Sequence, residues 1–502
     1  MHVLTAVQSR LLAFWRNLDP MVPMMMVAAL VGVIGSIAVE GFRQAMYAII
    51  HLYSVHEHLV AAAQGLPLWL RVLIPLGGAT AGGLIMWGGH RWIKQPRGPE
   101  YMEAVRVGDG VLPFAPNITR TLSSLAGVSG GITIGREGTM IQFAALISSI
   151  FGRFTRRDPE HRRLIVACGA AAGFAGAYHA PIAGTMFVSE IILGGLALRE
   201  ITAILVAAVM GELTTQALFA TGPLYLAHTI PAVGFPDLID ATLIGLLCGL
   251  LGPAFLWLLD NARRRYQSKV KFIPVRMALA GLVIGLLSML RPEVWGNGYS
   301  VVQAFLVHHW ALSSIAAVFV LRLLAVTAAS AAGIPGGVLT PTLSLGGALG
   351  LIVYHTLLTS TATHSQALWV LVGMGSLLAA TTHAPAMSAI MVFETTRSYN
   401  VVLAAMPACV VASVIGSLLR GRSVYTEALG LEEGAPKPSL LDAITGRRPR
   451  AHPENGPTVA AEVALAEPAP PAAPSLERVT SDLETAEEAA QRRRAAGESS
   501  DS

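Results

Sequence analysis

The sequence is dominated by long apolar stretches, each about the length needed to cross a lipid bilayer. A membrane-spanning helix needs about 20 mostly apolar residues. Clear stretches begin near Met24, Leu68, Ala241, Met277, Leu312 and Val401. Charged residues make up 13% of the 502 residues, whereas a soluble domain has about 25%. Because the chain lacks enough polar surface to face water on all sides, we predict an all-α polytopic membrane protein.

Arginines gather at the ends of apolar stretches. They are Arg10, Arg16, Arg153, Arg156, Arg157, Arg162, Arg163, Arg420 and Arg422. The positive-inside rule places such loops in the cytoplasm, which predicts that both termini are cytoplasmic and that residues 1–20 form a cytoplasmic N-terminal segment. Nucleic-acid binding is disfavoured, because these arginines do not share one amphipathic face. The first apolar run lacks a convincing cleavage site, so we interpret it as a membrane span.

The end of the chain has a different composition. Residues 431–502 are rich in Pro, Ala, Glu and Arg, a composition that predicts a disordered cytoplasmic tail. The three cysteines, Cys168, Cys248 and Cys409, are far apart in apolar sequence. Their spacing indicates neither a metal site nor a disulfide framework, and we expect them to pack in the core.

A block of about 22 residues occurs twice in the chain. His179-Ala180-Pro181 returns as His383-Ala384-Pro385, 204 residues later, and Glu190 returns as Glu394 at the same offset. We therefore predict a membrane domain over residues 21–425, with two inverted-topology repeats at about 21–222 and 239–425. In proteins of this kind the ion site lies mid-membrane, between broken or re-entrant helices whose N-terminal ends face the ion.

Glycine-rich breaks interrupt the helical pattern at four places. They are Pro96 to Glu100, Gly130 to Gly138, Trp295 to Tyr299 and Gly333 to Gly337. A dehydrated anion needs hydrogen-bond donors, and free backbone N–H groups at a helix start supply them. Each break alone is also compatible with a turn or a packing site, but four in this order favour an anion site.

Two of these breaks carry motifs that resemble the CLC family of chloride channels and proton/chloride antiporters. Gly135-Arg136-Glu137-Gly138 is similar to the family's GREGP motif, and Gly337-Val338-Leu339-Thr340-Pro341 is similar to its GxFxP motif. Tyr425 follows the last apolar stretch, as the family's pore tyrosine does. The resemblance extends from about Met21 to Tyr425 and is strongest to a bacterial branch of voltage-gated ClC-type channels.

The resemblance implies a role for each of these positions. Glu137 corresponds to the gating glutamate, whose carboxylate competes with the anion and leaves when protonated. The backbone N–H groups of Val338 and Leu339 and the hydroxyl of Tyr425 correspond to anion ligands. The remaining pore-motif residues are Gly135, Arg136, Gly138, Thr139, Gly337 and Pro341. The alternatives are a structural ion pair between Arg136 and Glu137, and a membrane-interface anchor for Tyr425.

The chain departs from the family pattern at three points. The family's GSGIP motif brings a serine to the ion, whereas Pro96, Arg97 and Gly98 stand here, so chloride and nitrate both remain candidates. Leu339 replaces the phenylalanine of GxFxP. The position of the antiporters' inner glutamate holds Ile191, which carries no proton, and we assign Glu190 and Glu394 a structural role.

These observations favour passive conduction of chloride or a similar small anion through a glutamate-gated pore. The alternative is a proton-coupled antiporter of chloride, nitrate or fluoride; Gly138-Thr139 in place of Gly-Pro also occurs in fluoride-exporting relatives. A remote alternative is an intramembrane serine protease that uses Ser129, within a GxSG string, and His179. A lone GxSG is a weak signal. The histidine also belongs to a motif that is repeated at His383, where no second GxSG accompanies it, so a structural role explains both histidines better.

The remaining expectations concern partners and place. From the resemblance we expect a homodimer with one pore in each subunit, in the bacterial inner membrane. The expected partners are small inorganic anions and membrane lipid, without nucleic acid. We expect no enzymatic activity, no metal and no cofactor, with chloride as the transported ion.

Overall fold

The computed structural model describes residues 21–93, 100–154, 158–194, 198–219, 222, 224–226, 230, 232–358 and 366–425. The predicted N-terminal segment 1–20, the positions Pro96, Arg97 and Gly98, and the predicted tail 431–502 lie outside these residues. Within them the regular structure is helical, apart from one isolated bridge between Gly135 and Gly337.

The helices of the first half run from α2 to α10. They are α2 (Met21–Ile50), α3 (Leu59–Gly65), α4 (Leu68–Trp92), α5 (Tyr101–Arg106), α6 (Phe114–Ser129), α7 (Glu137–Phe154), α8 (Pro159–Tyr178), α9 (Pro181–Met186), the π-helical η1 (Phe187–Leu193) and α10 (Leu198–Phe219).

The second half contains α11 to α18. They are α11 (Phe235–Lys269), α12 (Ile273–Leu290), the 3₁₀ turn η2 (Pro292–Val294), α13 (Tyr299–Val307), α14 (Leu312–Ala332), α15 (Leu339–Val353), the π-helical η3 (Tyr354–Leu358), α16 (Gln366–Thr382), α17 (Pro385–Thr396) and α18 (Tyr399–Leu419).

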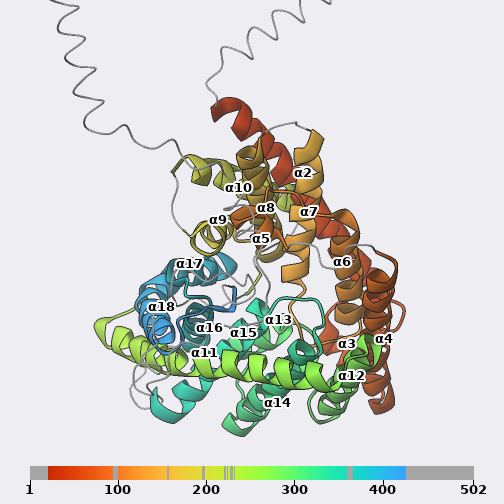
Figure 1. The fold of residues 1–502 in the computed structure, drawn as a ribbon. Helices are drawn as coiled ribbons and strands as arrows, with labels where there is room; N and C mark the ends of the chain where they lie inside the picture. The colour runs from red at the N-terminus through yellow and green to blue at the C-terminus, as the bar shows by residue number, and fades with distance from the viewer. Residues whose placement is uncertain are drawn as a thin grey trace, which may run out of the picture. The chain divides into compact units, whose positions relative to one another are not determined.

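Eight of the described helical segments are long and apolar enough to cross a membrane. They lie in α2, α4, α10, α11, α12, α14, α15 with η3, and α18. The six stretches recognised in the sequence fall in α2, α4, α11, α12, α14 and α18. The prediction of an all-α polytopic membrane protein is confirmed. The two halves are in contact as well: α4 packs along α12 (Figure 1).

The repeated block folds the same way in both halves. α8 ends before His179 and α16 ends before His383, and both histidines adopt a left-handed backbone, with φ of 54° and 59°. An alanine and a proline follow each histidine, and the proline begins α9 or α17. Proline suits the first turn of a helix because its missing N–H needs no partner there. Each half therefore contains the same helix–turn–helix break.

Each of the two repeated glutamates caps the start of a helix in the opposite half. Glu394 Oε1 and Oε2, near the end of α17, accept hydrogen bonds from the backbone N–H groups of Ile182 (2.9 Å) and Ala183 (2.7 Å) at the start of α9. In the reverse sense, Glu190 Oε2 accepts from the N–H of Met387 (3.0 Å) at the start of α17. A carboxylate at a helix start satisfies N–H groups that have no partner within the helix. Both glutamates thus hold α9 against α17, which lie side by side (Figure 1).

The core is packed closely enough to require glycine at some helix contacts. A Cβ placed on Gly373 of α16 would lie 2.3 Å from the carbonyl oxygen of Gly346 and 2.8 Å from the Cα of Gly350, both in α15. Small residues allow membrane helices to approach this closely. The three cysteines, as expected, are buried and free.

We predict that Gly373→Ala destabilises the protein, because backbone atoms of α15 cannot move aside for the new methyl group. Overpacking of this kind costs about 1–3 kcal/mol. The matched control is Gly77→Ala on α4, where a Cβ would meet no atom within 4 Å. Thermal unfolding in detergent should show a lower midpoint for Gly373→Ala and no decrease for Gly77→Ala. Equal midpoints for the two variants would contradict the close contact of α15 with α16.

Candidate functional site

The two sequence motifs meet at a pair of glycines. The N–H of Gly135 donates to the carbonyl of Gly337, and the N–H of Gly337 donates to the carbonyl of Gly135, both at 2.8 Å. A Cβ on Gly138 would lie only 3.0 Å from the Cα of Gly337. This bridge places the start of α7, at Glu137, beside the start of α15, at Leu339. The two motifs, about 200 residues apart in sequence, therefore form one site.

The carboxylate of Glu137 lies at the centre of this site. Glu137 is 1% exposed, and each of its oxygens accepts a short hydrogen bond. Asn297 Nδ2 donates to Oε1 and Thr340 Oγ1 donates to Oε2, both at 2.6 Å. Arg136 Nε lies 3.4 Å from Oε1, so the ion pair considered from the sequence is present. The ion pair is only one of three contacts that compensate this buried negative charge.

An aromatic wall surrounds the carboxylate and its donors. Tyr178 hydrogen-bonds to Thr340 through the two hydroxyl groups at 2.9 Å. The ring of Tyr178 meets that of Tyr299 edge-on, and Tyr299 also meets Tyr225 edge-on. The guanidinium of Arg136 lies 5.8 Å from the centre of the Tyr299 ring. The hydroxyls of Tyr225 and Tyr299 are buried and have no hydrogen-bond partner among the described residues, which is uncommon for buried polar groups in native proteins.

The loop before α13 carries Asn297 to the carboxylate. Gly298 follows with φ of 114°, a backbone conformation that residues with a Cβ rarely adopt. A buried arginine, Arg322 of α14, holds this loop through hydrogen bonds to its backbone. Its guanidinium donates to the carbonyls of Glu293 (2.7 Å) and Gly296 (3.2 Å). Asn297 thus lies between Gly298, whose backbone conformation shapes the turn, and Gly296, whose carbonyl is bound by Arg322.

The other predicted site residues take different positions. Val338 is the N-cap of α15, and Leu339 begins that helix and is buried. Tyr425 packs edge-on against Phe187 of η1, with ring centres 5.6 Å apart. Phe187 stacks on Phe174, at 4.9 Å, and Phe174 contacts Tyr178. Tyr425 is therefore linked to the Glu137 site through a row of aromatic rings.

Two further predicted residues belong to the walls of the site. The Thr139 hydroxyl donates to Ser124 Oγ of α6 at 2.8 Å. Pro341 lies in the first turn of α15 and is buried. The protease arrangement does not form: His179 contacts Glu212 at 3.2 Å, and within the described part of the chain the buried hydroxyl of Ser129 has no hydrogen-bond partner.

Asn297, Thr340 and Tyr178 were not predicted as site residues from the sequence. Asn297 lies in one of the four glycine-rich breaks, and Thr340 lies in the second motif. A polar residue inside a glycine-rich break could have been predicted as a site residue, because an ion within the membrane needs hydrogen-bond donors. Tyr178 precedes the repeated histidine, and only the fold brings it to Thr340.

Comparison with known proteins decides the family. A model of the family described as "Voltage gated chloride channel" matches residues 77–417. A protein of Ralstonia nicotianae named "Putative chloride channel protein ClcB-like" is 42% identical over 414 residues, covering 81% of this chain and 96% of that protein. The chain belongs to the CLC family of voltage gated chloride channels. A "Voltage-gated ClC-type chloride channel ClcB" of Salmonella typhimurium is 41% identical and covers 80% of this chain and 98% of that protein.

Solved CLC structures share the fold. A slow cyanobacterial Cl⁻/H⁺ antiporter matches with a TM-score of 0.72 and 23% identity, covering 82% of this chain and 98% of that one. A CLC-type fluoride/proton antiporter matches with a TM-score of 0.67 and 20% identity, covering 80% and 97%. This CLC protein is accordingly a multi-pass membrane transport protein with the family's architecture of two repeats and broken helices.

Proposed function

We propose that this CLC protein conducts chloride or a similar small anion passively, through a pore that the carboxylate of Glu137 gates. The observation that carries the proposal is the buried carboxylate held by Asn297 and Thr340 where α7 and α15 begin. A carboxylate oxygen and a halide ion need the same hydrogen-bond donors. Glu137 therefore occupies donors that a passing anion requires.

The surroundings of Glu137 suit an anion better than a cation. Arg136 supplies a positive charge, and the hydroxyls of Tyr225 and Tyr299, which have no partner among the residues that the structure describes, are donors. The first N–H groups of α15, near Val338 and Leu339, add the positive end of a helix dipole. Tyr425 supplies a further hydroxyl at the far end of the aromatic row. In this proposal the anion replaces the Glu137 carboxylate when that side chain is protonated and withdraws.

Passive conduction is favoured over antiport by the residue at the inner position. Ile191, at the position of the antiporters' inner glutamate, lies in η1 and is buried, and it cannot relay a proton. The curated relatives reported above are named channels. Antiport is the second candidate because Glu190, the residue next to Ile191, is only half-buried and carries a carboxylate.

The proposal also includes the assembly and orientation of the protein. The chain lies in the bacterial inner membrane with both termini in the cytoplasm, so the end of α2 at Ile50 faces outward. It forms a homodimer with one pore in each subunit and requires no cofactor. Pro96, Arg97 and Gly98, which lie outside the described residues, are proposed anion-binding residues from the family resemblance, and the residue type there bears on the choice between chloride and nitrate.

We predict that Glu137→Gln abolishes acid activation of the anion flux. A neutral amide cannot change its charge, so at saturating anion concentration the flux from proteoliposomes should be high at pH 7.5 and unchanged at pH 5.5. The unsubstituted protein should conduct more at pH 5.5. If Glu137→Gln kept the pH dependence of the unsubstituted protein, Glu137 would not be the gate.

A pair of threonine variants separates the gate from general damage. Thr340→Val removes one of the two short donors to the carboxylate, and a hydrogen bond to a charged group is worth about 1.5–3 kcal/mol. The ratio of the flux at pH 5.5 to the flux at pH 7.5 should therefore fall by about three-fold or more, because the lost donor weakens the hold on the closed carboxylate, whereas its effect on anion binding is the same at both pH values. Thr342→Val is the matched control, because Thr342 donates only to the carbonyl of Val338, one turn earlier in its own helix.

We further predict that an anion gradient drives no uphill proton movement through the protein. Ile191 has no exchangeable proton, so proteoliposomes loaded with chloride should release it without net acidification or alkalinisation beyond that set by the membrane potential. Simultaneous chloride and pH electrodes measure both fluxes. Proton transport against its gradient, driven by chloride, would establish the antiporter instead; its loss in Glu190→Gln would assign the relay to that residue.

A further inference from the structure

A large cavity opens beside the gate, at the end of α2 where Ile50 lies. Its volume is about 1060 Å³, and its walls come from α2, the α2–α3 connection, the turn after α8, and α13. Arg136, which precedes the gating residue, and Tyr299 line it. The cavity therefore adjoins the Glu137 site through the side chain that pairs with the carboxylate.

Histidines are the most numerous ionisable side chains in the described lining of this cavity. The ionisable residues there are Glu40, Arg43, His51, Glu57, His58, Arg136, His179 and His308, together with the phenols of Tyr47 and Tyr299. The two arginines and two glutamates balance in formal charge. Histidine is the side chain whose charge changes between about pH 5 and 8. The net charge of the cavity is thus set by its histidines.

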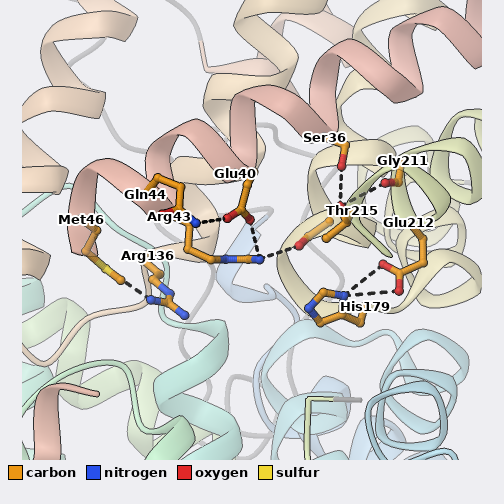
Figure 2. A network of polar contacts seen from close by, with 11 residues as sticks. Ser36, Glu40, Arg43, Gln44, Met46, Arg136, His179, Gly211, Glu212 and Thr215 are labelled. Atoms are coloured by element: carbon orange, nitrogen blue, oxygen red, sulfur yellow. Dashed lines mark hydrogen bonds and ion pairs between the residues drawn. The ribbon is translucent and has the colours of Figure 1, made fainter. Parts of the chain in front are cut away.

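The fixed charges are held in place by direct contacts (Figure 2). Arg43 Nη1 lies 2.7 Å from Glu40 Oε2, and Arg43 Nη2 donates to the carbonyl of Gly176 at 2.7 Å. Gln44 Nε2 donates to the other oxygen of Glu40 at 2.6 Å. Arg136 is engaged with Glu137 and with the Met46 sulfur. Because these contacts hold both arginine side chains in place, their positive charges stay at fixed positions in the cavity wall.

The four histidines are not equivalent. His179 is paired with Glu212 of α10, at 3.2 Å (Figure 2). Gln216 also donates to that glutamate. A charge on His179 is therefore compensated locally. His51, His58 and His308 are exposed to the cavity. Protonation of these three side chains adds up to three positive charges. Of the two glutamates in the described lining, Glu40 is paired with Arg43, so Glu57 is the one that can offset part of the added charge.

We propose that this cavity is a proton-controlled collecting site for small inorganic anions, in which His51, His58 and His308 set the local anion concentration at the gate. The proposal rests on the anion pore proposed above and adds a second acid-dependent element to it. A concave surface of one charge sign concentrates ions of the opposite sign and raises their entry rate by about 10-fold or more. Acid thus acts twice: it releases Glu137 and it fills the cavity with anions.

The two effects separate in kinetics. In Glu137→Gln no carboxylate competes with the anion, so a pH-dependent change in the anion concentration at half-maximal flux reports the collecting site alone. The test is made in the Glu137→Gln background, where the gate no longer titrates, with flux measured over a range of external chloride at pH 7.5 and 5.5. We expect the half-saturating chloride concentration to fall about three-fold or more at pH 5.5, with little change in maximal flux.

The triple substitution His51→Gln, His58→Gln and His308→Gln should remove this fall. The three side chains are exposed, so the folded core is not disturbed. His90→Gln, at the last turn of α4 and away from the cavity lining, is the matched control and should behave like the parent. The single variant His58→Arg should lower the half-saturating concentration at pH 7.5, because its charge is permanent.

Two results would overturn the proposal. One is a half-saturating concentration in the Glu137→Gln parent that does not depend on pH. The other is a pH-dependent fall that survives the triple substitution. Raising the ionic strength with an impermeant salt should weaken the effect, since screening shortens the reach of exposed charges. Failure of the gate itself is recognised separately, as a maximal flux that still depends on pH in Glu137→Gln.

Discussion

The structure of this protein is organised around one negative charge that is kept away from water. An isolated carboxylate in an apolar interior is costly and persists only where donors and positive charge meet it. Glu137 satisfies this condition through Asn297, Thr340 and Arg136, which come from three separate segments. The groups that compensate this charge also suit a halide, which is the basis of the proposal that an anion takes the place of the carboxylate.

The two repeats supply these groups because they are locked together at several levels. The backbone bridge between Gly135 and Gly337 aligns the starts of α7 and α15. The glutamates Glu190 and Glu394 each hold the helix start of the opposite half. Close glycine contacts then fix α15 against α16. These constraints fix the positions of the donors, so the proposed replacement of the carboxylate by an anion needs little reorganisation of the backbone.

Much of this fold follows from the sequence, but the contacts of the site do not. Apolar length predicted the spans, and the duplicated His-Ala-Pro block predicted the repeat, because both are local patterns. Thr340 and Glu137 are 203 residues apart, and Asn297 and Glu137 are 160 apart. Contacts over such separations depend on how the halves pack, which no local pattern specifies. The same holds for the cavity, whose histidines come from three distant segments and show no common motif.

The central claim is that the Glu137 carboxylate stands where an anion binds. Its most direct test is the anomalous diffraction of bromide in crystals of the unsubstituted protein and of Glu137→Ala. We expect a bromide peak within hydrogen-bonding distance of Thr340 Oγ1 and Asn297 Nδ2 in the variant, and the carboxylate with no bromide at that place in the unsubstituted protein. A variant without bromide there, or an unsubstituted protein with both the ion and the carboxylate in that position, would contradict the account.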